Sequence, residues 1–298
     1  MEPTITGLRV LRAIAERGTF TAAAAALGYT QPAVSRQVAA LERAAGAALI
    51  ERSAGGARLT PAGQTLLRHA RVALDAIEAA GRELSGAETT TEPVRLGVYL
   101  SAGAALLPRA LSTLRRRHPH IEVITRDGTS PALVRALRAG TLDLAVISSR
   151  PPHHPPDTEL PRLRLQTLDE GALRVAVADP GPFSGLGALT VADLTGADWI
   201  ASPATATEPL LGVWPGLPGH PRVRHHARDW LTKLRLVQAG CGITTVPEAL
   251  APALPPGVLL QPVEDAGSVE QRRTVLAGPP GPRPAAVAAV ARALGGPA

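Results

Sequence analysis

The sequence predicts an α/β protein whose first sixty residues form a separate, mainly helical unit. Residues 8–15 carry apolar side chains at helical spacing and are soon followed by a run of five alanines. Residues 61–84 are typical of one long helix, which ends before the polar stretch SGAETTTEP. From residue 94 onward, short apolar segments alternate with amphipathic ones, the pattern of strands and helices in an α/β domain.

The composition bounds the class of protein. A chain of 298 residues suggests about two domains. The net charge of +6 favours an anionic partner such as nucleic acid, with a basic excess of no consequence as the alternative. The single cysteine, Cys241, excludes a disulfide within the chain and fits a reducing compartment. Neither a signal peptide nor a membrane span is indicated, so we expect a cytoplasmic protein with no membrane partner.

The first 27 residues predict two helices. One buries Leu8, Leu11 and Ile14 and ends at Gly18. Thr19 or Thr21 caps a second helix through the alanines, whose small side chains allow a neighbouring helix to approach closely. Plain helix propensity is the alternative explanation of the alanines. The solvent side of the first helix is expected to carry Arg9, Arg12, Glu16 and Arg17.

A third helix is expected to begin after Thr30, with Pro32 in its first turn. Val34, Val38 and Leu41 fall at i, i+4 and i+7 and should face inward. The opposite face is small in the middle and polar or basic at its edges, which suits entry into the major groove of DNA. The second and third helices together therefore predict a helix-turn-helix.

Each polar residue of this unit has a candidate role, with an ordinary solvated side chain as the alternative for any one of them. Gln31 suits an adenine edge, Arg36 a guanine or a phosphate, and Ala33 a thymine methyl group. Residues 49–52 and 58–60 predict a small hairpin, or wing, whose arginines suit phosphates or the minor groove. The candidate DNA contacts are Thr21, Thr30, Gln31, Pro32, Ala33, Ser35, Arg36, Arg52 and Arg58, with Thr21 and Ser35 assigned to phosphates.

The stretch LRVLRAIAERGTFTAAAAALGYTQPAVSRQVAALERAAGAALIER, followed by RLTPAG, resembles the winged helix-turn-helix of LysR-type transcriptional regulators. The resemblance covers residues 4–63 without gaps, and Leu11 and Ile50 stand where that family often has Phe. It implies a regulator that binds double-stranded promoter DNA as a homodimer or homotetramer and responds to a small-molecule effector. RNA polymerase is a further candidate partner.

The long helix that follows carries a heptad seam, which predicts pairing with a second copy of the chain. A helix docked on its own domain is the alternative. With Thr60 as cap and Pro61 as first residue, the helix would span roughly 35 Å. We expect a DNA-binding domain over residues 1–60, a linker helix and hinge over 61–92, and an effector-binding domain over 93–298. The expected dimerisation seam is Leu66, Ala70, Ala73, Ile77, Ala80 and Leu84.

The last two hundred residues predict parallel sheets covered by helices on both faces. The segments GTLDLAVI, LVQAGCGITTVP and LTVADL resemble the effector domain of the same family, which is similar to type 2 periplasmic binding proteins. The resemblance implies two α/β subdomains, the first over residues 93–163 and 270–298 and the second over 164–269. The two strands that connect them are expected near 163–168 and 264–272.

Ligands of open α/β sheets bind at the carboxyl ends of strands, beside helix N-termini. Ser130, expected at the start of a helix, suits a carboxylate, although a capping role alone is the alternative. Arg150 is a further candidate for binding an anionic effector, with a merely exposed side chain on the proline-rich loop RPPHHPPD as the alternative. By resemblance, the candidate effector-binding residues are Ser101, Thr129, Ser130, Ser148, Ser202, Pro203, Ala204, Val246 and Pro247.

We find no residue pattern that predicts catalysis, a metal site or a cofactor. Adjacent histidines such as His153 and His154 do not share one face of a strand or helix, so they make poor metal ligands. The segment FSGLG lacks the Gly-x-Ser-x-Gly spacing of a nucleophile elbow. We therefore expect a regulator and not an enzyme. A solute-binding protein without a role in gene regulation and an α/β enzyme remain the alternatives.

Overall fold

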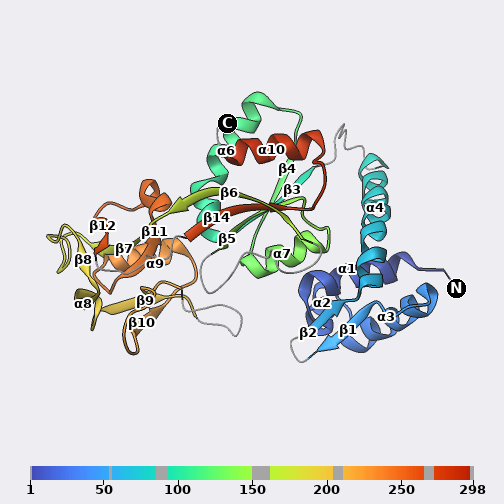
Figure 1. Ribbon diagram of the computed structural model, residues 1–298, viewed down its shortest axis with the longest axis horizontal. Coiled ribbons are helices and arrows are strands. Elements are labelled where there is room, and N and C mark those ends of the chain that lie inside the picture. Colours follow the sequence, from blue (N-terminus) through green and yellow to red (C-terminus); the bar gives the residue numbers. More distant parts are fainter. Residues whose placement is uncertain are drawn as a thin grey trace.

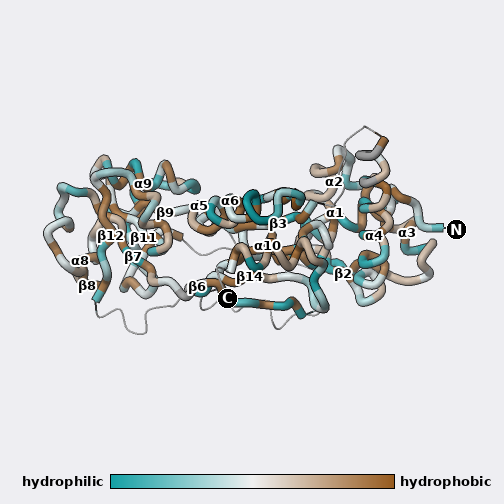
Figure 2. The backbone as a smooth tube through the Cα atoms, turned by 90° about the horizontal axis from the view of Figure 1, so that it is seen from above, coloured by the Kyte–Doolittle hydropathy of each residue, from teal (hydrophilic) through white to brown (hydrophobic). Residues whose placement is uncertain are grey.

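The computed structural model describes residues 2–53, 56–84, 93–149, 162–203, 211–264 and 272–295. The chain forms three parts in a row along its long axis (Figure 1; Figure 2). At one end lies the head, which we define as residues 4–59. A five-stranded sheet with its helices occupies the middle, and a set of smaller sheets lies at the other end.

The head contains the three expected helices and the wing. Thr19 and Thr30 cap the second and third helices by accepting hydrogen bonds from the backbone amides of Ala22 (3.1 Å) and Ala33 (3.4 Å). Val34 and Val38 are buried in the core as expected. The elements are α1 (Ile5–Arg17), α2 (Phe20–Leu27), α3 (Gln31–Ala45), β1 (Ile50–Ser53) and β2 (Gly56–Leu59).

Two of the five alanines allow α2 to approach its neighbours. Ala23 and Ala24 are buried in one cluster with side chains of α1 and α3, whereas Ala25 and Ala26 are exposed. Close packing therefore accounts for half of these four alanines, and helix propensity alone is sufficient for the exposed pair.

The wing is an antiparallel hairpin in which Ile50 lies opposite Leu59. The amide of Ala57 donates a 2.8 Å hydrogen bond to the carbonyl of Gly18 at the end of α1. A Cβ atom on Gly56 would lie 2.5 Å from that same carbonyl oxygen. The wing is thus fastened to α1. Residues 54–55 of the expected turn lie outside the described residues.

The long helix α4 (Pro61–Leu84) begins at Pro61, directly after Thr60, as expected. The Thr60 hydroxyl accepts a hydrogen bond from the amide of Gly63 (3.0 Å) and donates one to the carbonyl of Ala48 (2.7 Å). The expected seam is divided: Leu66 and Ala70 pack against the chain's own residues, and the other four members are exposed. The exposed members are Ala73, Ile77, Ala80 and Leu84.

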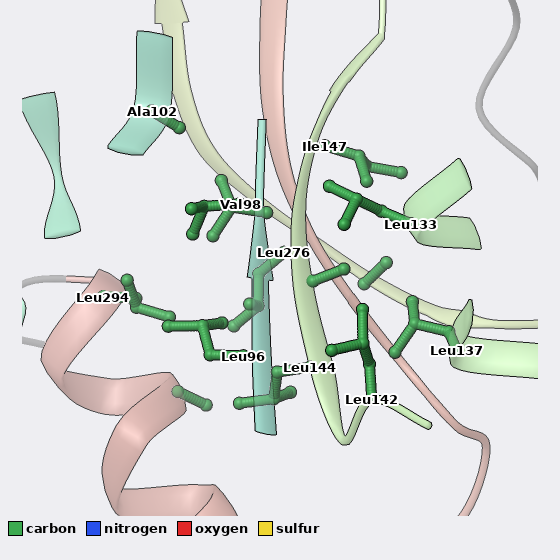
Figure 3. Close-up of a cluster of buried hydrophobic side chains, with 14 of the residues drawn as sticks. Leu96, Val98, Ala102, Leu133, Leu137, Leu142, Leu144, Ile147, Leu276 and Leu294 are labelled. Carbon is green, nitrogen blue, oxygen red and sulfur yellow. The ribbon is translucent and has the colours of Figure 1, made fainter. Parts of the chain in front are cut away.

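The central sheet has the order β4-β3-β5-β14-β6. Helix α7 covers one face of it, with Leu133 beside Ile147 and Leu137 beside Leu142, while Leu294 of α10 lies beside Leu96 (Figure 3). The strands are β3 (Val94–Val98), β4 (Val123–Asp127), β5 (Leu144–Ser149), β6 (Arg164–Gly171) and β14 (Arg272–Gly278). The helices are α5 (Leu100–Ala105), α6 (Leu107–Arg117), α7 (Ser130–Arg138) and α10 (Ala285–Gly295).

The remaining part is built around β7, which pairs with β11 and β12 in antiparallel fashion. The expected parallel arrangement holds for β4-β3-β5, β9-β10 and β8-β13, but it is wrong for β7 and β14. A short buried apolar run has the same composition whichever direction its neighbours take. The elements are β7 (Leu173–Ala178), β8 (Leu189–Thr190), α8 (Val191–Leu194), β9 (Asp198–Ala201), β10 (Arg222–His226), α9 (Trp230–Gln238), β11 (Thr244–Pro247), the 3-10 helix η2 (Glu248–Ala253), β12 (Val258–Gln261) and β13 (Val263–Glu264).

The strand expected to connect the two subdomains near 163–168 overlaps β6 (Arg164–Gly171). Strand β6 stays paired with β14 as far as Gly171, so the change of sheet falls at Ala172. Of the second expected connection, residues 265–271 lie outside the described residues. Among the helices that are described, none combines the length and the apolar character needed to cross a membrane.

Candidate functional site

The polar face of α3 is open to solvent. Gln31, Pro32 and Arg36 are exposed, and Ala33 and Ser35 are half-buried. All five belong to the residues that the sequence assigned to DNA contact. Thr21 and Thr30 are also exposed, at the first turn of α2 and at the cap of α3. The buried valines on the opposite side of α3 hold this face outward, so its donors are available to a ligand as large as a DNA duplex.

One wing arginine is ordered by contacts with α3 and α2. Nη2 of Arg52 donates a 2.9 Å hydrogen bond to Oγ of Ser35, and its guanidinium lies 4.3 Å from the centre of the Phe20 ring. A cation over the face of an aromatic ring is attracted by the ring's negative face, which helps to hold the Arg52 guanidinium in place. Arg52 and Ser35 therefore form one positioned donor pair, while Arg58 of β2 is exposed.

Four polar residues line a cleft at the carboxyl ends of β3, β4 and β5: Ser101, Thr129, Ser130 and Ser148. Ser130 does not cap α7, which corrects the alternative role considered for it: Thr129 accepts the hydrogen bond from the amide of Ala132 (3.4 Å). Thr129 has the extended backbone that a cap requires, whereas Ser130 is already helical. Oγ of Ser130 instead accepts a 3.0 Å hydrogen bond from the amide of Ser148.

The opposite wall of the cleft contains Ser202 and Pro203 as expected. Val246 does not line it, because its side chain is fully buried in the core of the second part. Pro247 lines a separate small cavity beside Tyr99. Side chains alternate along a strand, so it is Thr245 that faces the cleft. Ala204 and Arg150 lie outside the described residues.

Lys233 of α9 is a cleft residue that the sequence analysis did not single out. Its side chain is only 2% exposed, and its Nζ donates a 2.9 Å hydrogen bond to Oγ of Ser202. The ammonium also lies 5.1 Å from the centre of the Trp230 ring. A signal was present, because Lys233 is the only lysine of the chain and stands among apolar residues of a helix.

The N-terminus of α9 also reaches this wall. Asp229 accepts a 2.8 Å hydrogen bond from the amide of Thr232, and this bond holds the pKa of the Asp229 carboxyl below its usual value. Asp229 is thereby engaged in capping α9. Among the residues that the structure describes, no three His, Cys, Asp or Glu side chains gather as metal ligands do.

The cleft opens into a larger hollow of about 2180 Å³. This exceeds the 300–1,000 Å³ that is usual for a small-molecule site. The excess arises because the hollow continues along α7 to the end of α1 and to the wing, where Gly18 and Arg58 line it. Helix α7 therefore borders both the cleft and the space beside the head.

Comparisons with protein families match both parts of the chain. The model described as "LysR substrate binding domain" matches residues 87–296. The model described as "Bacterial regulatory helix-turn-helix protein, lysR family" matches residues 5–64. Together they span almost the whole chain.

Individual relatives agree with these matches. The probable hydrogen peroxide-inducible genes activator of Mycobacterium xenopi is 38% identical over 148 residues, which cover 49% of this chain and 78% of that protein. Its counterpart in Mycobacterium avium is 34% identical over 201 residues, covering 57% of this chain and 64% of the relative.

Solved structures show the same architecture. A hydrogen peroxide-bound cysteine mutant of Corynebacterium glutamicum OxyR is 28% identical, with a TM-score of 0.51 over 98% of this chain and 94% of that one. Full-length CbnR in complex with its target DNA is 23% identical, with a TM-score of 0.56 over 98% of both chains. The latter likeness concerns the fold alone.

Proposed function

Because the chain belongs to the LysR family of transcriptional regulators, we propose that it reads promoter DNA through α3 and the wing and responds to an effector bound between its two α/β subdomains. The observation that carries the first half is the open polar face of α3, held outward by a buried apolar face. Gln31 and Arg36 lie in the first two turns of α3, the part of a recognition helix that reaches base edges.

Fluorescence anisotropy with the DNA that flanks the gene tests this reading, in the presence of unrelated competitor and at several salt concentrations. Affinity should fall steeply with salt while a specific excess for one site remains. Arg36→Ala should weaken specific binding by about 1–3 kcal/mol if Arg36 contacts a base, or reduce the salt slope by about 1 if it contacts a phosphate.

Arg117→Ala is the matched control, because it removes the same charge from an exposed position at the end of α6. It should leave DNA binding as it is. If Arg36→Ala and Arg117→Ala behave alike, the assignment of α3 as the reading helix is wrong.

The four exposed residues of the linker seam support self-association. Ile77 and Leu84 are large apolar side chains exposed on α4. Ala73 precedes them and Ala80 lies between them, and all four are exposed at heptad spacing. A second copy of α4 would cover them, giving a homodimer or, through a second contact, a homotetramer. RNA polymerase is the further partner through which a bound regulator would act, and we place this activity in the cytoplasm, where bacterial promoter DNA is found.

The cleft chemistry supports an anionic effector. A buried ammonium, that of Lys233, stands on one wall, and the hydroxyls of Ser101 and Ser130 stand on the other. Donors of this kind suit a carboxylate or another oxyanion. Trp230 beside the ammonium offers an apolar surface for the rest of the molecule.

Lys233→Met tests the charge preference, because methionine keeps much of the length and removes the ammonium. Trp230 fluorescence would be followed while small carboxylates and their amides are titrated. The native protein should prefer carboxylates and the variant should not. Arg235→Met, on the exposed side of the same helix, is the control and should keep the preference. Equal affinity of the native protein for acid and amide would contradict an anionic effector.

The names of several relatives refer to hydrogen peroxide, but this chain offers one cysteine in its 298 residues. A disulfide between two cysteines of the same chain therefore cannot form. Cys241 is half-buried in the turn after α9. We accordingly propose reversible binding of a small molecule as the signal.

A further inference from the structure

The head of the protein is packed against the central subdomain through a built interface. Helix α1 contacts α7, and Figure 1 shows these two helices at the boundary between the two parts. The sequence placed Glu16 on the solvent side of α1. In the structure its side chain is only 15% exposed, because β4 and α7 cover it.

Glu16 is the polar centre of this interface. Its carboxylate forms an ion pair with Arg126 of β4. Its backbone carbonyl accepts a 3.3 Å hydrogen bond from Nε of Arg135 on α7. The stem of Arg135 lies against Gly18, where an added Cβ atom would come within 3.5 Å of it. One residue of the head is thus bound by two arginines of the effector domain.

An apolar contact completes the interface. Ala139, directly after α7, is 1% exposed and packs into the cluster that contains Leu11, Leu41 and Leu49 of the head. A residue of the effector domain therefore fills part of the head's own core. Burial of this kind is lost as a whole when the two parts separate, because the cluster would then open to water.

The linker helix is tied to both sides as well. Arg71 of α4 reaches Asp143 before β5 (2.8 Å). Glu78 of α4 bridges Arg12 of the head (2.9 Å) and Arg95 of β3 (3.5 Å). These ion pairs join the head, α4 and the central sheet in one network, although each pair alone is worth little at a surface.

The same helix that holds the head begins in the effector cleft. Ser130 lies in the first turn of α7, where its hydroxyl accepts the hydrogen bond from the amide of Ser148. Ala139 follows the last turn. The distance along the helix axis is roughly 14 Å, which a single rigid helix spans without a joint. A displacement at one end of α7 therefore appears at the other.

We propose that α7 transmits the state of the effector cleft to the DNA-binding head within one protomer, with Glu16, Arg126, Arg135 and Ala139 as the contact that it tightens or releases. This inference rests on the proposed function for the identity of the cleft. A ligand that contacts Thr129 or Ser130 shifts α7, and the shift changes how firmly the head is held. To act, the ligand must bind one of the two arrangements more tightly than the other.

The contact can be measured by the reactivity of a thiol placed inside it, in the full chain and without any ligand. In a Cys241→Ser background, the Ala139→Cys variant should react with N-ethylmaleimide far more slowly than an Ala25→Cys variant, whose site on α2 is exposed. Equal rates would show that the head is not held against α7, and would overturn the proposal.

Two substitutions, each added to the Ala139→Cys variant, then test the contact made by Glu16 and the coupling along α7. Glu16→Gln removes the charge at the interface and should speed the reaction about twofold to fivefold. Ser130→Ala acts at the far end of α7 and should speed it about threefold. Ser112→Ala, the same change on the exposed surface of α6, should not alter the rate.

If Ser130→Ala leaves the rate of thiol modification as it is in the Ala139→Cys variant alone, transmission through α7 is refuted. If Glu16→Gln leaves that rate unchanged, Glu16 does not hold the head against α7. Because the thiol assay contains no DNA, these results are separate from the anisotropy measurement. A slow, Ser130-sensitive thiol in a protein that binds no DNA would refute the proposed function and leave the coupling intact.

Discussion

Replacing Ala23 with leucine measures how tightly the helices of the head are packed. Ala23 has no exposed surface and is buried in one cluster with side chains of α1 and α3, among them Val10 and Val34. Leucine adds three carbon atoms at this point. If space were available, their burial would stabilise the head by about 2.4 kcal/mol at about 0.8 kcal/mol for each methylene.

Ala23 is fully buried in this cluster, and protein interiors are close-packed. We therefore expect overpacking to dominate, with a cost toward the upper end of the usual 1–3 kcal/mol, or about 3 kcal/mol. A unit of some sixty residues has a total stability of only about 3–9 kcal/mol. The single substitution would thus remove a large share of the head's stability.

Hydrogen–deuterium exchange of the full chain is the suitable assay, because all three tryptophans lie at or beyond residue 199 and do not report on the head. Amides of α2 and α3 should exchange roughly 100-fold faster in Ala23→Leu. Ala26→Leu, in the same helix but exposed, should stay within about 0.5 kcal/mol of the native protein. Similar exchange in the two variants would refute close packing as the reason for the buried alanines.

Three further substitutions test other parts of the fold. Gly63→Ala should destabilise the start of α4, because the new Cβ would lie 2.1 Å from the carbonyl oxygen of Leu49; normal amide protection of residues 61–70 would contradict this. Leu137→Ala should cost about 2–5 kcal/mol in the core of the central subdomain, measured by urea unfolding of that part. The folded pKa of Asp229 is depressed, so its contribution to stability is present above the unfolded pKa and is lost as the pH falls through the folded one. Trp230 fluorescence should therefore report fraying of α9 below about pH 4, and Asp229→Asn should abolish that transition.

Most of the head could be predicted from local signals. Thr30 as cap, Pro32 in the first turn and buried Val34 and Val38 all follow from spacing, because capping and helical periodicity involve residues within one or two turns. The start of α4 at Thr60 follows for the same reason.

The candidate cleft could be predicted only in part. Its position at the strand ends follows from the alternation of strands and helices, and Ser101, Thr129, Ser130 and Ser148 do meet there. Which residue of a buried strand faces the ligand is a matter of register, and a shift of one position exchanges Val246 for Thr245. Lys233 enters the cleft from a helix more than eighty residues away from Ser148 in the sequence, so no local pattern places it there.

The amino-acid sequence determined the class of the protein, the order of its elements and the face of α3 that meets the solvent, since these depend on neighbours in the chain. The tertiary structure decided the direction of β7 and β14, the residues that line the cleft and the burial of Glu16 between two parts of the chain. A charged residue on an amphipathic helix has the signature of a solvated one, and only the approach of β4 and α7 turns it into the centre of an interface. That approach is made by residues more than a hundred positions away, and no periodicity within α1 encodes it.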